Sequence, residues 1–84
     1  MSIAPPRTVF DVLTDFLAGS PSPEHILAYR LPPELEARAL DLMTRKRETG
    51  LALDESLELD DFIRADDMMT LLKAKTRQKL VDQQ

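Results

Sequence analysis

The sequence predicts an all-α protein, an antiparallel helical hairpin that ends in a long C-terminal helix and is packed by one or two short N-terminal helices. The chain has only 2 glycines, both at expected helix ends, which leaves little room for strands and β-hairpins. Apolar residues recur at helical spacing through most of the chain. Prolines and capping residues divide that spacing into separate segments.

Length and composition favour one small domain that needs help to bury its core. The 84 residues suffice for a single domain at most. We expect residues 1–7 to form a flexible arm, residues 8–81 a single helical domain and residues 82–84 a frayed tail. Three Phe, one Tyr and no Trp supply little apolar bulk. Small chains of this kind often rely on metals, disulfides or self-association for stability.

Charge and residue usage exclude several classes of protein. The absence of cysteine removes disulfides, thiolate zinc sites and cysteine nucleophiles, and it fits a reducing compartment. The net charge of −4 argues against uniform attraction to nucleic acid or to an anionic membrane. No apolar run approaches the roughly 18 residues of a spanning helix, and the start lacks the pattern of a signal peptide. We therefore expect a soluble cytoplasmic protein.

Two short helices are predicted before residue 32. Thr8 can cap the first, with Asp11 completing a capping box and Gly19 ending the helix. Ser22 can cap the second, which opens on Pro23. The prolines at 32 and 33 then close this helix.

A third helix is predicted from Pro33 to about Thr49, with Gly50 as its left-handed cap. Its expected apolar stripe is Leu35, Ala39, Leu40, Leu42 and Met43. Acids occupy its first turn and Arg45–Arg47 its end, as the helix dipole favours. The connection that follows is so short that the third and last helices should be antiparallel neighbours.

The last helix should begin between Ala52 and Asp54 and run to the vicinity of Leu80. A heptad-like seam along it consists of Phe62, Ala65, Met69, Leu72 and Thr76. Further apolar residues lie off that seam: Leu57, Leu59, Ile63, Met68, Leu71 and Ala74. At about 100° per residue, the bulky apolar positions span roughly 280° of the circumference. Because one partner helix covers a narrower stripe, we expect wrapping by other helices and by a second copy.

The methionines suit either a core or an adaptable binding surface. Helical spacing favours core packing for Met43, Met68 and Met69. If the middle of the last helix is uncovered, Met68, Met69 and Leu72 become the first candidates for binding a protein partner. The resulting hypothesis is a protein-interaction module that forms a homodimer or binds another protein.

No constellation of residues indicates catalysis or a metal site. Acids are dense between Asp54 and Asp67, but adjacent ones diverge by about 100° and no glycine-rich calcium loop accompanies them. His25 is the single histidine, too few for zinc without cysteine. The serines lack a nucleophile-elbow context. We therefore expect no enzyme activity, no cofactor, no metal and no small-molecule substrate.

An alternative hypothesis is a nucleic-acid-associated regulator that uses the basic end of the last helix: Lys73, Lys75, Arg77 and Lys79. In an antiparallel hairpin, however, Arg45–Arg47 would face the acids at 54, 55 and 58. The basic end would lie towards Glu34–Glu36. These charges would then compensate each other, which weakens the nucleic-acid hypothesis.

Four segments resemble one family of proteins. They are SPEHILAYR at 22–30, the Gly50–Leu51 step before an acidic helix start, ELDDF at 58–62 and LLKAKTR at 71–77. This set is similar to a family of short bacterial helical proteins with a SPEEILA-like start and an LLKAKAR-like ending. The resemblance extends from about Val9 to Leu80. The chain departs from the family at Ala52–Leu53, where a Thr-Pro cap is usual, which leaves the exact start of the last helix open.

The resemblance implies no catalytic or binding residues. Some members of the family are encoded beside HNH-type nucleases. That neighbourhood implies a role as a partner, or as an antitoxin-like regulator, of a neighbouring protein.

Overall fold

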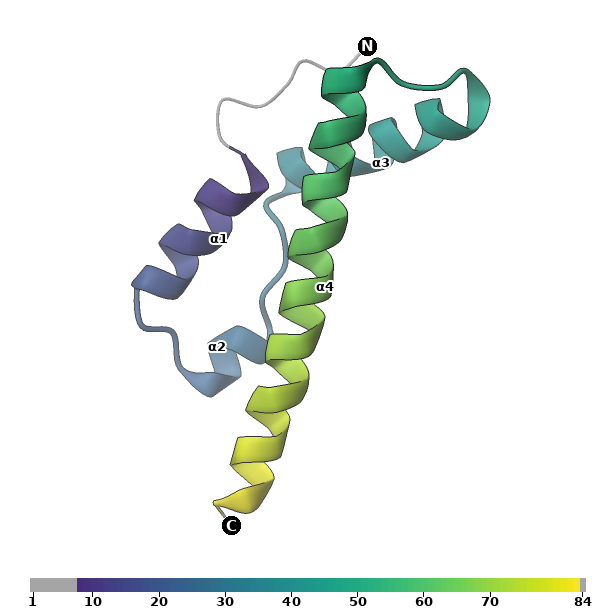
Figure 1. Ribbon diagram of the computed structural model, residues 1–84. Helices are drawn as coiled ribbons and strands as arrows, with labels where there is room; N and C mark the ends of the chain where they lie inside the picture. The colour runs from purple at the N-terminus through teal and green to yellow at the C-terminus, as the bar shows by residue number, and fades with distance from the viewer. Residues whose placement is uncertain (1–7, 84) are drawn as a thin grey trace.

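The computed structural model describes residues 8–83, which form four helices (Figure 1). In chain order these are α1 (Val9–Ala18), α2 (Pro23–Leu27), α3 (Pro33–Glu48) and α4 (Leu53–Asp82). The described residues contain no strand, so the predicted all-α fold with a long C-terminal helix is confirmed. Helices α1, α2 and α3 all pack against α4. The fold is therefore organised around its last helix.

Local capping sets the helix boundaries, as predicted. The Asp11 N–H donates to Thr8 Oγ1 at 3.1 Å, and the Thr8 N–H donates to Asp11 Oδ2 at 3.2 Å. At the second helix, the His25 N–H donates to Ser22 Oγ at 3.2 Å. These bonds satisfy backbone donors that a helix start leaves unpaired.

The two glycines end α1 and α3 in different ways. Gly50 has φ +87°, the left-handed conformation predicted for it. Gly19 has φ −78°, and the following residue, Ser20, takes the left-handed conformation at φ 55°. Gly19 therefore ends α1 as predicted but does not adopt the left-handed conformation.

Helix α4 starts at Leu53, within the predicted interval. Ala52 is the N-cap and has no side-chain acceptor, so only half of a capping box forms. The Ala52 N–H donates to Glu55 Oε1 at 3.2 Å. Helix α4 extends to Asp82, two residues beyond the vicinity of Leu80.

The core is one small cluster of apolar side chains from α1, α3 and α4. Its buried members are Val9, Leu13, Leu35, Leu42, Leu59, Phe62, Ala65 and Met69. The predicted seam of α4 is largely confirmed, since Phe62, Ala65, Met69 and Thr76 are buried and Leu72 packs partly against the core. Leu59, which was expected off the seam, extends it by one turn because α3 covers that side of α4.

The predicted stripe of α3 is partly wrong. Leu40 and Met43 are 56% and 46% exposed, whereas the buried residues of this helix are Leu35, Arg38 and Leu42. Arg38 can face inward because Glu58 of α4 neutralises its charge. This inward position rotates Leu40 and Met43 towards solvent.

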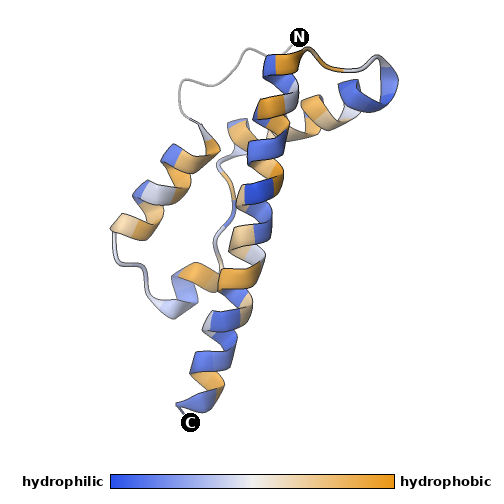
Figure 2. Cartoon of the chain, viewed as in Figure 1, coloured by the Kyte–Doolittle hydropathy of each residue, from blue (hydrophilic) through white to orange (hydrophobic). Residues whose placement is uncertain are grey.

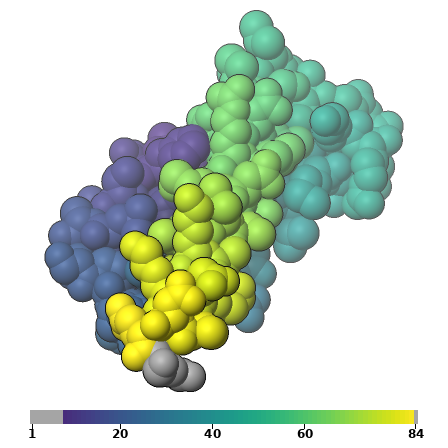
Figure 3. Space-filling model, turned by 60° about the horizontal axis from the view of Figure 1, so that its bottom comes forward, coloured from purple at the N-terminus to yellow at the C-terminus, as the bar shows by residue number. Residues whose placement is uncertain are grey.

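The described chain is elongated rather than spherical. Its principal extents are 50 × 23 × 18 Å, and its radius of gyration is 14.9 Å. A compact chain of this length would have a radius of gyration of roughly 12 Å. Figure 3 shows α4 as a ridge at the surface, with α1 and α2 on one side and α3 on the other. One side of α4 is thus left uncovered.

Candidate protein interface

Charged pairs fix the position of α3 against the first half of α4. Arg38 donates from Nε to Glu58 Oε2 and from Nη2 to Glu58 Oε1, both at 2.8 Å. Arg45 donates to Glu55 and also lies 3.3 Å from Asp41 Oδ2. The prediction that the basic end of α3 faces the acids of α4 is confirmed for Arg45 and Glu55. Glu58, in contrast, pairs with Arg38.

These pairs also shift the ionisation of their members. The hydrogen bond from Arg45 is the main reason why the pKa of Glu55 lies below its ordinary value of 4.5. The hydrogen bond to Glu58 likewise raises the pKa of Arg38. Glu55 and Glu58 therefore bind α3 to α4. They are not among the acids on the exposed side of α4.

A cleft of about 240 Å³ lies between α1, residues 29–31, the start of α3 and the middle of α4. Its floor is apolar and includes Leu13 and Phe62, while charged residues line its rim. Two rim cations already have partners: Arg30 lies 3.9 Å from Glu36, and Lys73 Nζ donates to the Tyr29 carbonyl at 2.9 Å. The cleft therefore presents balanced charge and does not define one class of ligand.

Tyr29 lies beside this cleft with its ring against Phe16, the ring centroids being 4.4 Å apart. Its hydroxyl is buried and has no hydrogen-bond partner among the described residues. Burial raises the pKa of Tyr29. The side chain thus contributes to the fold through its ring rather than through its hydroxyl.

Exposed apolar side chains along α4 are a second feature of the surface. Large apolar side chains that remain exposed on this helix are Leu53, Leu57, Ile63, Met68, Leu71 and Val81. Figure 2 shows apolar and polar residues interspersed along the side of α4 that faces the viewer. We define the outer stripe as Asp54, Leu57, Asp61, Arg64, Met68, Leu71 and Lys75, which follow one another by three or four residues. All of these are exposed except Asp61, which is half-buried.

The three residues predicted to bind a partner occupy different environments. Met68 is 41% exposed and belongs to the outer stripe. Met69 is 7% exposed and packs in the core, and Leu72 packs partly against the core. Successive residues of a helix diverge by about 100°, which separates Met68 from Met69. Met69 is therefore removed from the candidate interface, and the core packing expected for Met43 and Met68 is wrong.

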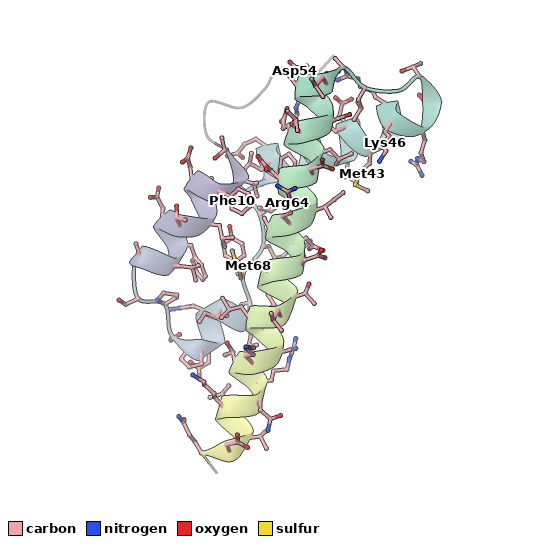
Figure 4. All side chains as sticks on the ribbon, in the orientation of Figure 1. Phe10, Met43, Lys46, Asp54, Arg64 and Met68 are labelled. Carbon is pink, nitrogen blue, oxygen red and sulfur yellow. The ribbon has the colours of Figure 1, made fainter. Side chains whose placement is uncertain are left out.

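The sequence analysis placed Leu71 off the seam but did not assign it to a binding surface. Leu71 is 57% exposed and lies one turn from Met68 on the same side. The three-four spacing of Leu57, Asp61, Arg64, Met68 and Leu71 was a signal for this surface, and it was hidden because two of these residues are charged. In Figure 4, Arg64 and Met68 lie towards the α1 side of α4, whereas Met43 and Lys46 project from α3 on its other side.

The basic residues near the end of α4 do not form a single patch. Lys73 and Arg77 share one side of the helix, and Lys75 and Lys79 share another, about 160° away. Lys73 is engaged by the Tyr29 carbonyl. Within the described residues, none of the four forms an ion pair with Glu34 or Glu36, because α4 extends past the start of α3. Glu36 and Lys73 nevertheless line the same cleft. The charge compensation expected at this end therefore stays a prediction, as does the nucleic-acid hypothesis.

Among residues 8–83, no group of three His, Asp or Glu side chains could hold a metal ion. No helix in that same range combines the length and apolar character needed to cross a membrane. Comparison of the chain with protein-family models, with curated proteins and with solved structures finds no match. The family resemblance thus stays a prediction, and the candidate interface stands on geometry alone.

Proposed function

We propose that this protein is a non-enzymatic protein-interaction module that self-associates as a homodimer through the outer stripe of α4. The observation that carries the proposal is the exposure of Leu57, Met68 and Leu71 on one side of the longest helix. Apolar residues grouped at helical spacing on an uncovered helix are typical of a helix-binding surface.

The small core supports the same conclusion. The radius of gyration exceeds that of a compact chain, and the fully buried side chains are few for a domain of this size. A second copy on the outer stripe would add apolar burial that the isolated chain lacks. Self-association would therefore stabilise the fold as well as create a dimer.

The dimer would leave another apolar surface free. Leu40 and Met43 are exposed on α3. Figure 4 shows Met43 on the other side of α4 from Arg64 and Met68. We propose that this surface binds a protein partner, such as the product of a neighbouring gene. In the role of an antitoxin-like regulator, the protein would bind its partner through this surface of α3.

Sedimentation velocity over a series of concentrations tests self-association. We expect the unmodified chain to be a dimer and Leu71→Glu to be a monomer, because a carboxylate would be placed in an apolar interface. Thr70→Glu is the matched control, since Thr70 is exposed, adjacent and about 100° from Leu71. A monomeric unmodified chain at the highest soluble concentration would overturn the proposal, as would equal effects of the two variants.

A further inference from the structure

We propose that the second copy lies antiparallel to the first, with Leu57 against the partner's Met68 and Asp61 against the partner's Arg64. This inference rests on the proposed self-association and adds the orientation and register. The outer stripe repeats by three and four residues, which is the spacing of a two-helix seam. A second copy of this chain would therefore fit against the outer stripe.

The order of charges along the stripe selects the antiparallel orientation. Its acids, Asp54 and Asp61, both precede its bases, Arg64 and Lys75, along the helix. A parallel pair in register would set Asp61 against Asp61 and Arg64 against Arg64. Like charges in contact disfavour that complex, whereas an antiparallel pair sets acid against base.

The pattern of apolar residues then selects the register. With Asp61 opposite the partner's Arg64, Leu57 falls opposite the partner's Met68. Leu71 falls beside the partner's Leu53 and Asp54. The two-fold symmetry of a homodimer makes each contact twice. Sliding one helix by a heptad would instead set Leu57 against the partner's Lys75 and Asp61 against the partner's Leu71, which removes both the Leu57–Met68 contact and the Asp61–Arg64 pair.

Both charged residues at the centre are available for these contacts. Within the described residues, the side chains of Asp61 and Arg64 make no hydrogen bond or ion pair. The acids that hold α3 are Glu55 and Glu58, which are not in the outer stripe. Pairing across the stripe would therefore leave the contacts of α3 with α4 intact.

Disulfide cross-linking tests the orientation directly, because the chain has no native cysteine. We expect a mixture of Leu57→Cys and Met68→Cys chains to form a covalent dimer under mild oxidation. Each variant alone should form none, since residue 57 and the partner's residue 57 would lie about 16 Å apart along the helix. A disulfide needs Cα atoms within about 7 Å.

A parallel dimer would reverse this result, with each single variant cross-linking to itself. That outcome would overturn the inference. It would leave the proposed self-association in place, because sedimentation would still report a dimer. A monomer in sedimentation would remove both proposals.

Charge reversal tests the central pair independently. Asp61→Arg and Arg64→Asp should each raise the dimer dissociation constant roughly tenfold or more, since each sets like charges together twice. The double variant should restore dimerisation, because the two signs exchange places across the symmetry axis. Circular dichroism of each monomer checks that the fold is unchanged. Failure of the double variant to restore the dimer would contradict the antiparallel register.

Discussion

Arg38 and Glu58 form a bidentate ion pair between α3 and α4, although the Arg38 side chain is 6% exposed and that of Glu58 is 27% exposed. The two members of the pair are thus unequally buried. Since a buried charge without a partner is costly, removal of each member should have a different effect. Asp41 Oδ2 lies 3.7 Å from Arg38 and supplies only weaker compensation.

Loss of Glu58 should be the more damaging change. We expect Glu58→Ala to lower the free energy of unfolding by about 3 kcal/mol, because it leaves the Arg38 guanidinium buried and poorly paired. Arg38→Met should cost less than about 1 kcal/mol, since it replaces the charge with apolar bulk and leaves a carboxylate that water can reach. Urea denaturation measures both values. Equal costs for the two variants would show that the burial of Arg38 has no such effect.

The face of α3 that packs on α4 can be tested by comparing two leucines. Leu42 is 0% exposed and Leu40 is 56% exposed, two residues apart on the same helix. We expect Leu42→Ala to lower the free energy of unfolding by about 3 kcal/mol, through lost burial and the cavity that remains. Leu40→Ala, the matched control, should cost less than about 0.5 kcal/mol. Thermal unfolding of both variants checks this, and the reverse order would mean that α3 is rotated differently.

Those two leucines also show how far the sequence could predict the fold. Helix boundaries were predictable because they depend on neighbours within one turn, as Thr8, Ser22, Pro33 and Gly50 illustrate. The rotation of α3 was only partly predictable. From the sequence alone, Arg38 is expected to be a surface residue. Its burial depends on the carboxylate of Glu58, 20 residues away.

The candidate interface was predictable to a similar degree. The excess of apolar surface on α4 followed from periodicity, but helical spacing favoured core packing for Met68, which is exposed. Met69 and Leu72 were assigned to the same surface because sequence alone does not show which arc α1 and α3 leave open. The exposed side of α4 depends on how α1, α2 and α3 pack against it, and this packing is a feature of the tertiary structure.

The pairing of Glu55 with Arg45 predicts a dependence of stability on pH. Because the pKa of Glu55 is lowered in the folded state, its contribution is present above the ordinary value of 4.5 and is lost as pH falls through the folded pKa. The stability difference between the unmodified chain and Glu55→Gln should therefore be constant near neutral pH and should shrink below about pH 4.5. Urea denaturation at a series of pH values measures it.

A double-mutant cycle provides the control for this pH effect. The main cause of the lowered pKa is the hydrogen bond from Arg45. In an Arg45→Met background, the dependence of the Glu55→Gln difference on pH should therefore be much weaker. An unchanged dependence would assign the effect to the Ala52 backbone instead, since its N–H also donates to Glu55.

The two glycines offer a final comparison, because they end helices with opposite signs of φ. Gly50 has φ +87° with open space where a Cβ would be, so any penalty at this site comes from backbone conformation alone. We expect Gly50→Ala to lower the free energy of unfolding by about 1 kcal/mol. At Gly19, φ is −78° and a Cβ would lie 3.4 Å from the Phe16 carbonyl oxygen, a contact at the edge of the ordinary range. Gly19→Ala should therefore cost less, and thermal unfolding that ranks Gly19 as the more sensitive site would contradict the left-handed cap at Gly50.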